Sequence, residues 1–427
     1  MDTYETDLSD DAIERYIKCY EIMLAARQQD PELLREAYEG IDDLVLSIDG
    51  LQPEKGHETL YVIRELRAKR VWFAVPLLSS AESEIKKLIE EARSWAERLG
   101  KPVHAWMSDK QTAFVNTIAE VFPGVAHRYC KNHFMRDVAK PVLEADSASK
   151  MQLRRRVRGL RTIEREILER HSSEDEETVD AAEDVVLDYC SAIRGILNSN
   201  QGSPTHPAGL RMMDGLKKVR RSLQVNIDLG RDTPSHAYVS RLASRIDRGF
   251  EVTADGFRQV RRGVKQVRAV ERTLDPETGN CEEREEAFDT LRDGFAAKQD
   301  VVSQHMAKLM ESFKPGLFVG GDDVDLPEDN LDLERWFKNP KGHERRIHGH
   351  RHAGTRIVEE GPTEMLALDA HWAHPHTFSP EELQPYHNAK MPKTQKAAIH
   401  RRKIMRKARS KKKIKALLKD LEQRYSA

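Results

Sequence analysis

Two patterns of apolar residues, first a helical one and then a strand-like one, follow one another in the N-terminal part of the chain. From Asp11 to Gly40, apolar residues recur at the spacing of a helix, which predicts one or two helices. Three short runs come next that are apolar, β-branched or aromatic and end at Gly, Pro, Lys or Arg, as strands do. These runs are Leu44–Asp49, Glu58–Leu66 and Arg70–Leu78. Three strands in close succession indicate a meander.

Helices and strands then alternate. The predicted elements are a helix over Ser80–Leu99, a strand over Pro102–Asp109, a helix over Thr112–Phe122 and a short strand over Val125–Cys130. The order β-β-β-α-β-α-β predicts an α/β fold in which helices pack on a mixed sheet whose first strands are antiparallel.

A long region without strand patterns follows. From about His133 to Lys314 the pattern is that of long helices with arginine-rich faces, interrupted by one acidic loop, Ser172–Asp180. This region is predicted to be an all-helical insertion. After a break rich in Gly, Asp and Pro, Asn330–Lys338 predicts another helix, for which Asp329 or Asn330 is the expected N-cap.

Composition restricts the classes of protein that fit. The longest strongly apolar run, Val71–Leu78, is far shorter than the roughly 18 residues that a membrane helix needs, and the acidic N-terminus is unlike a signal peptide. The four cysteines, Cys19, Cys130, Cys190 and Cys281, form no C-x-x-C pair. We therefore expect a cytoplasmic protein without a membrane partner, a disulfide framework or a cysteine-only zinc site.

Two aspartates stand where predicted strands end. Asp49 follows the first strand and Asp109 the fourth, and carboxylates at the ends of neighbouring strands can meet at one edge of a sheet. Such oxygen ligands suit Mg²⁺ or Mn²⁺, and a two-metal centre with a third carboxylate would serve in-line phosphoryl transfer. An aspartate at a strand end is also an ordinary turn former, so spacing alone does not decide between the two readings.

The segment Ser108–Phe134, SDKQTAFVNTIAEVFPGVAHRYCKNHF, resembles the core of Mutator-like and related bacterial insertion-sequence transposases. These share an Asp at a strand end, a helix, a Pro-Gly turn and then C-x-x-H before an aromatic residue. The resemblance extends loosely over residues 44–352. It implies a ribonuclease H-like fold with a three-carboxylate DDE site, in which Asp109 is the second carboxylate and His133 lies near the active site.

The same resemblance implies the other two carboxylates. Asp49 takes the first position by strand order, and Glu334, on a helix after the insertion, takes the third. Asp332 is its nearest competitor, and further acidic residues crowd the region: Asp322, Asp323, Asp325, Glu328 and Asp329. The predicted regions are an N-terminal helical segment (1–40), the first part of the catalytic core (41–136), the insertion (137–315), the last part of the core (316–389) and a basic tail (390–427).

Cysteine and histidine patterns offer weaker signals. C-x-x-H alone is poor evidence for zinc without a second ligand pair, so Cys130 is expected to be a small buried residue at a strand end. If their segment is extended, His348, His350 and His352 would share a face, but the surrounding cations favour phosphate contact over metal binding. His371, His374 and His376 are further candidate ligands.

Net charge is −1 because strongly basic and acidic segments cancel. Lys390–Lys415 contains 13 Lys or Arg and no acidic residue, which predicts binding to a polyanion, although a solvated disordered tail or a helix laid along DNA fits as well. The expected DNA contacts are Lys338, Lys341, Arg345, Arg346, Arg351, Arg401, Arg402 and Lys403.

The sequence thus predicts a DNA transposase that uses Mg²⁺ or Mn²⁺ to cleave and join strands at the ends of a mobile element. The resemblance also implies a homo-oligomer acting on paired DNA ends near the nucleoid. Two alternatives stay open. The first is a truncated transposase that regulates by binding DNA or a partner, and the second is a general nuclease of ribonuclease H-like fold.

Overall fold

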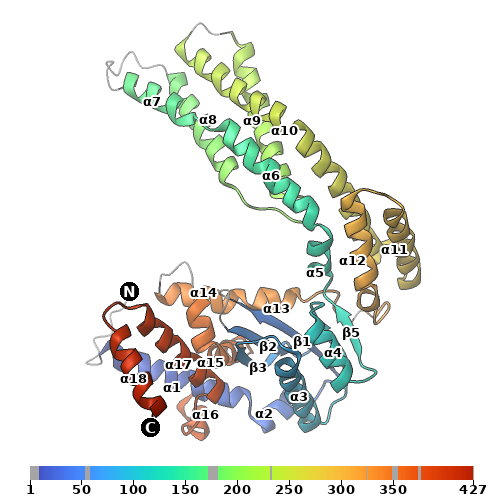
Figure 1. Cartoon of the computed structure of the whole chain (residues 1–427), viewed down its shortest axis with the longest axis vertical. Coiled ribbons are helices and arrows are strands. Elements are labelled where there is room, and N and C mark those ends of the chain that lie inside the picture. Colours follow the sequence, from blue (N-terminus) through green and yellow to red (C-terminus); the bar gives the residue numbers. More distant parts are fainter. Residues whose placement is uncertain are drawn as a thin grey trace. The chain divides into compact units, whose positions relative to one another are not determined.

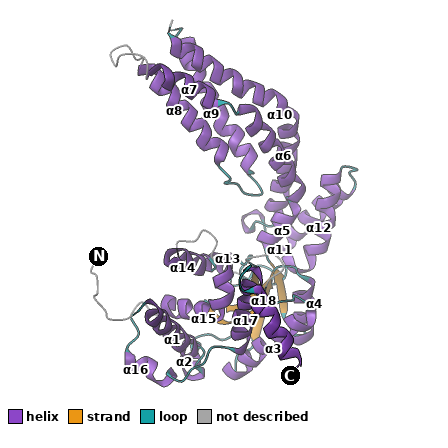
Figure 2. Cartoon of the chain, turned by 60° about the vertical axis from the view of Figure 1, so that its left-hand side comes forward, coloured by secondary structure: helices purple, strands orange, loops and turns teal. Residues whose placement is uncertain are grey.

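A computed structural model describes residues 9–52, 58–171, 181–230, 233–323, 325–348, 354–373 and 377–426. The chain forms two compact units. The sheet unit comprises Met1–Asn132 and Pro315–Ala427, and the helical unit comprises His133–Lys314. Figures 1 and 2 show that the strands gather in the first unit and that helices make up the second.

The sheet unit is a mixed α/β structure built on five strands in the order β3-β2-β1-β4-β5. The strands are β1 (Leu44–Leu51), β2 (Thr59–Glu65), β3 (Arg70–Leu77), β4 (Val103–Ser108) and β5 (Ala126–Tyr129). β1, β2 and β3 pair antiparallel, whereas β4 runs parallel to β1 and β5 parallel to β4. The predicted mixed sheet with antiparallel strands first is therefore confirmed.

Alternation along β1 gives the sheet two apolar faces. Leu44, Leu46 and Ile48 pack with helices α2 (Pro31–Ala37), α3 (Glu82–Leu99) and α4 (Thr112–Val121). On the opposite face, residues of β2 and β3 pack against α13 (Leu331–Trp336) and α15 (Gly354–Ala373). Helices thus cover both faces of the sheet, as the burial of alternate strand residues requires.

Both ends of the chain belong to this unit. α1 (Asp10–Gln28) packs on α15, and α17 (Lys393–Arg409) packs on α15 and β3. The remaining elements are α14 (Lys338–His348), α16 (Pro380–Leu383), the 3₁₀ helix η3 (Gln384–Tyr386) and α18 (Ile414–Ser426). The interpretation of residues 390–427 as a disordered tail is wrong, since Ala398 and Gln395 of α17 are fully buried.

The helical unit has helices as its main elements throughout the part that is described. α5 (Lys131–Val138) begins two residues before it; α6 (Lys140–Val157), α7 (Leu160–His171), α8 (Ala181–Asn198), α9 (Ala208–Asp228), α10 (Pro234–Thr273), η2 (Pro276–Thr278), α11 (Cys281–Ala296) and α12 (Val301–Leu317) follow. The predicted large helical region is confirmed. Ser172–Asp180, the predicted acidic loop, lies outside the described residues.

Close packing of α6 against α10 depends on three glycines at seven-residue spacing. A Cβ on Gly249, Gly256 or Gly263 would come within 3.0 Å of a side chain of α6. Seven residues are nearly two helical turns, so the three glycines line one side of α10. They allow the two helices to approach more closely than larger residues would.

No helix in the described ranges is both long enough and apolar enough to cross a bilayer. This agrees with the short apolar runs of the sequence.

Candidate active site

Strand register brings Asp49 and Asp109 to the same level of the sheet. On the parallel strands β1 and β4, Ser47 pairs with Met107, and each aspartate lies two residues further along the chain, Asp49 within β1 and Asp109 directly after β4. Neighbouring strands are about 4.8 Å apart, so the two backbone positions are adjacent at the carboxyl edge. The prediction that the first strand ends at Asp49 is wrong: β1 continues to Leu51, and Asp49 pairs with Val62 of β2.

The surroundings of Asp49 leave no room for a side chain at the next residue. A Cβ on Gly50 would lie 2.9 Å from Thr59 Cγ2 and 3.0 Å from the ring of Tyr61. The backbone N–H of Gly50 donates to Asp49 Oδ1 at 2.7 Å. Glycine at position 50 therefore lets the side chains of β2 pack closely against β1 next to Asp49.

Asp109 lies in a turn between β4 and α4 that is fixed by hydrogen bonds. Its Oδ1 accepts the N–H of Gln111 at 3.3 Å, and the hydroxyl of Ser108 donates to its carbonyl at 2.6 Å. His127 Nε2 lies 2.8 Å from the same hydroxyl, and burial lowers the pKa of His127 to about 4. A neutral His127 thus helps to hold the turn without adding charge.

The third carboxylate arrives on a segment that is tied to the end of β5. Arg128 Nη1 donates to the carbonyl of Leu326 at 2.8 Å, and the N–H of Lys131 donates to the carbonyl of Glu328 at 3.1 Å. Lys131 Nζ also pairs with the Glu328 carboxylate at 2.8 Å. These contacts bring a segment nearly two hundred residues away in sequence to the carboxyl edge.

Asn330 joins this segment to two strands. Its side chain accepts a hydrogen bond from the hydroxyl of Ser47 at 2.6 Å and donates to the carbonyl of Ile48 at 3.4 Å, while its backbone N–H points to Cys130 Sγ at 3.3 Å. The sequence suggested only an N-cap here. Asn330 does occupy the N-cap position, but Asp329 Oδ1 accepts the N–H of Leu331 instead.

α13 then presents Glu334 at the border of the core. Leu333, Trp336 and Phe337 are buried against β2 and β3, and Glu334 is half-buried beside them. The competitor Asp332 lies 3.2 Å from the buried guanidinium of Arg64, which also pairs with Asp369 at 3.1 Å. Asp332 is therefore engaged in an ion pair with Arg64.

Several of the other acidic neighbours also have partners away from the candidate site. Asp323 contacts His104 at 3.1 Å, Asp325 contacts Arg67 at 3.9 Å, and Glu328 and Asp329 make the contacts described above.

Lys341 interacts electrostatically with two of the candidate carboxylates. Burial lowers its pKa, as does Arg345, whereas Asp49 and Glu334 raise it. Its ammonium therefore senses carboxylates from the first strand and from α13. The sequence predicted only a DNA contact for Lys341, because the distance to Asp49 cannot be read from spacing.

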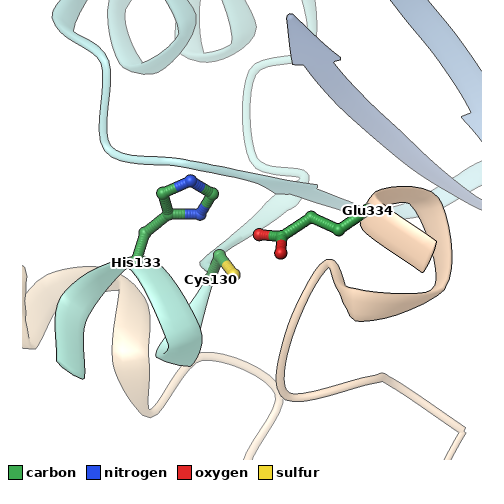
Figure 3. A group of neighbouring side chains, drawn as sticks. All are labelled: Cys130, His133 and Glu334. Atoms are coloured by element: carbon green, nitrogen blue, oxygen red, sulfur yellow. The ribbon is translucent and has the colours of Figure 1, made fainter. Parts of the chain in front are cut away.

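Glu334 also has neighbours of a different kind. Figure 3 shows its carboxylate extending towards Cys130 and His133, and the ligand atoms of these three residues lie within 4.8 Å of one another. Among the described residues, Cys130, His133 and Glu334 are the three potential metal ligands that lie this close together. Asp49 and Asp109 are not part of this group. Cys130 is fully buried directly after β5, as predicted.

The predicted DNA contacts differ in exposure. Lys338, Arg345, Arg346 and Lys403 are exposed. Arg402, only 3% exposed, instead pairs with the buried carboxylate of Glu58 at 3.3 Å, and Arg401 pairs with it at 2.7 Å. Burial removes Arg402 from the expected DNA contacts.

Other predicted residues lie partly beyond the described ranges. Arg351, His350, His352, His374 and His376 are outside them. His348 ends α14 rather than lying in an extended segment. His371 has its Nε2 at 3.4 Å from the hydroxyl of Tyr20 and its ring against Phe378, so it is placed as a packing residue.

A scan against models of known protein families finds no match to this chain, and a search among curated proteins finds no related sequence. The functional argument therefore depends on the residues themselves.

Proposed function

We propose that the sheet unit is a ribonuclease H-like catalytic core and that the protein is a DNA transposase, which cleaves and joins strands at the ends of a mobile element. The main supporting observation is the position of the carboxylates: Asp49 near the end of β1 and Asp109 directly after the parallel strand β4 lie at the same level of the sheet, and the segment before α13 is hydrogen-bonded to β1. The strand order, with β1 between an antiparallel pair and two parallel strands, is consistent with that fold.

The donor set fits a hard divalent cation. Asp49 and Asp109 offer carboxylate oxygens, which Mg²⁺ and Mn²⁺ prefer, and both are half-buried. Asp49, Asp109 and Glu334 would hold the ions, which supply Lewis acidity to the attacking and leaving oxygens when bound.

The cations of α14 would orient the DNA. Lys341 balances the charge of Asp49 and Glu334, and Lys338, Arg345 and Arg346 extend positive charge along the same helix to solvent. Ammonium and guanidinium groups bind phosphates without reading sequence, so they fix the strand relative to the carboxylates. His133, on the first turn of α5, offers an imidazole that can donate to the scissile phosphate.

The helical unit adds a second basic surface. Arg258, Arg262 and Lys265 are exposed and lie at helical spacing on one side of α10. Such a face attracts a polyanion with a strong dependence on salt. We assign it to DNA outside the cleavage site.

Cleavage of labelled DNA tests the proposal. The full chain is incubated with the DNA that flanks its gene, with Mg²⁺ or Mn²⁺, and nicks are mapped. Asp49→Asn, Asp109→Asn and Glu334→Gln are each expected to reduce cleavage by at least about 1,000-fold, because each removes a charged ligand. The matched control is Asp332→Asn, which removes a neighbouring carboxylate that contacts Arg64 and is expected to keep cleavage within about tenfold.

The same assay separates the alternatives. Equal cleavage of random-sequence DNA and RNA-DNA hybrids would favour a general nuclease. DNA binding without any metal-dependent nick would favour a regulator. Full activity of the Asp109→Asn variant would overturn the proposed site itself.

A further inference from the structure

A thiol, an imidazole and a carboxylate meet beside the proposed catalytic edge. Cys130 follows β5, His133 lies on the first turn of α5, and Glu334 comes from α13 (Figure 3). The boundary between the two units falls after Asn132, but α5 begins at Lys131. The local turn of that helix therefore sets the position of His133 relative to Cys130.

The geometry is close to that of a tetrahedral metal site. The three ligand atoms lie within 4.8 Å of one another. Zinc bonds of about 2.0–2.3 Å place tetrahedral ligands roughly 3.3–3.8 Å apart, so a closure of about 1 Å completes the site. Rotation of the Glu334 and His133 side chains, neither of which is fully buried, supplies such a shift without moving the backbone.

The chemistry of the donors selects a different ion from the one proposed for the aspartates. Sulfur and imidazole nitrogen are the preferred ligands of Zn²⁺, whereas Mg²⁺ takes oxygen. Three protein ligands leave a fourth position for water or a substrate atom. C-x-x-H alone lacks enough ligands for zinc, and Glu334 adds the third from a distant segment.

The backbone around the sulfur is already ordered for such a role. The N–H of Asn330 points to Cys130 Sγ at 3.3 Å, and the side chain of Asn330, 1% exposed, is held by β1. Because Asn330 and Glu334 belong to adjoining turns, the residue that orients the sulfur also positions the carboxylate.

We propose that Cys130, His133 and Glu334 bind Zn²⁺, and that Zn²⁺ bound there withdraws Glu334 from Asp49 and Asp109. Zinc binding stands on the donor set alone, and only the inhibitory consequence rests on the proposed function. Glu334 is then the carboxylate shared by two sites, one with oxygen ligands and one with sulfur and nitrogen.

Cobalt binding to the full chain tests the site without any activity. Co²⁺ replaces Zn²⁺ and, when bound to thiolate, gives a charge-transfer band in the near ultraviolet. The wild-type chain is expected to show this band and lose it on addition of Zn²⁺. Cys130→Ser should abolish the band and weaken Zn²⁺ binding by about 100-fold, whereas Cys190→Ser, which changes another fully buried cysteine, should leave both unchanged.

Two further variants guard against a folding defect in Cys130→Ser. His133→Ala and Glu334→Gln keep the sulfur, and each is expected to weaken Zn²⁺ binding by at least about tenfold with an unchanged circular dichroism spectrum. A band that persists in Cys130→Ser, or Zn²⁺ affinity that is unaffected in both other variants, would overturn the site.

Cleavage under Mg²⁺ then tests the consequence. Micromolar Zn²⁺ should inhibit the wild-type chain, and the Cys130→Ser variant should resist it. Equal inhibition of both would overturn the withdrawal of Glu334. A chain that binds cobalt through Cys130 but never cleaves DNA would retain the zinc site and refute the proposed function.

Discussion

Both units contain buried carboxylates with hydrogen-bond or ion-pair partners, but the sheet unit also contains a group of neighbouring buried glutamates. In the helical unit, the buried Asp146 accepts the N–H groups of Gly209 and Leu210 at 2.7 and 2.9 Å, and the buried Glu183 pairs with Arg170 at 2.8 Å. In the sheet unit, Glu364 is 2% exposed, and burial followed by the nearby Glu344 raises its pKa well above the ordinary value.

This group comprises Glu21, Glu344, Glu360 and Glu364, whose mutual repulsion adds to burial in raising the pKa of Glu21 and Glu364. Buried carboxylates with hydrogen bonds or ion pairs stabilise a structure, whereas carboxylates gathered without enough cations cost stability. Glu21 shows the same effect, since burial and Glu360 raise its pKa to about 7.

The largest expected effect tests how the sheet unit holds its third carboxylate. Asn330→Ala removes side-chain bonds to Ser47 and Ile48 and leaves their polar atoms buried. We expect a loss of about 2–4 kcal/mol in the free energy of unfolding of this unit, measured by denaturant titration. The matched control is Asn116→Ala, an exposed asparagine bonded to Glu82, with an expected change below about 0.5 kcal/mol.

Equal small changes in both asparagine variants would contradict the anchoring role of Asn330. The same variant should also reduce metal-dependent cleavage, because α13 would no longer be fixed to β1.

A smaller effect concerns the buried carboxyl groups whose pKa is raised. The unfolded Glu364 loses its proton near its ordinary pKa of 4.5, whereas the folded residue keeps its proton to a higher pH. Between those two values the folded state binds more protons, so stability falls as pH rises. Glu364→Gln removes the titrating group and should raise stability at pH 8 by on the order of 2 kcal/mol, with little change at pH 4.

Glu14→Gln is the control for this pH dependence. Its carboxylate is exposed and pairs with Lys18 at 3.3 Å, so stability should change by less than about 1 kcal/mol at either pH. If the Glu364→Gln variant is as stable as the wild type at both pH values, the pKa of Glu364 is not raised in the folded state.

The smallest expected effect lies in the helical unit. A Cβ at position 256 would lie 2.5 Å from Ser149 Oγ but 3.5 Å from its Cβ. Gly256→Ala alone should therefore be destabilising or neutral, and Ser149→Ala should relieve the clash. The double variant lacks the clash and keeps the higher helix propensity of alanine over glycine. A double-mutant cycle should therefore give a coupling energy of about 1 kcal/mol between the two positions. Strict additivity would contradict close contact between α6 and α10.

The sequence predicted much of the sheet but little of what joins it to distant segments. Periods of two and of three to four residues located all five strands and the helices between them, because each element buries one or two apolar faces. α15 received no prediction, and its sequence contains Gly361-Pro362, a pair that usually ends a helix. Packing explains the glycine, since a Cβ there would lie 2.5 Å from Leu60 Cδ2.

In the candidate site too, some residues could be found from local sequence patterns and others could not. The end of β4 directly before Asp109 could be predicted from the apolar pattern, whereas β1 runs two residues past Asp49, because Gly50 and Leu51 still pair with β2. The meeting of Cys130 with Glu334 depends on contacts across about two hundred residues, which no local pattern encodes. Arg402 was misassigned for a related reason: a basic run does not reveal that Glu58 buries one of its members.

Affinity cleavage by iron tests the central claim most directly. Fe²⁺ bound in place of Mg²⁺ produces hydroxyl radicals with ascorbate and peroxide, and these cut the backbone nearest to the ion. We expect cuts of the full chain close to residues 49, 109 and 334, suppressed by excess Mg²⁺ and lost in the Asp109→Asn variant. Cuts elsewhere, or cuts that persist unchanged in that variant, would contradict a shared metal centre at this edge of the sheet.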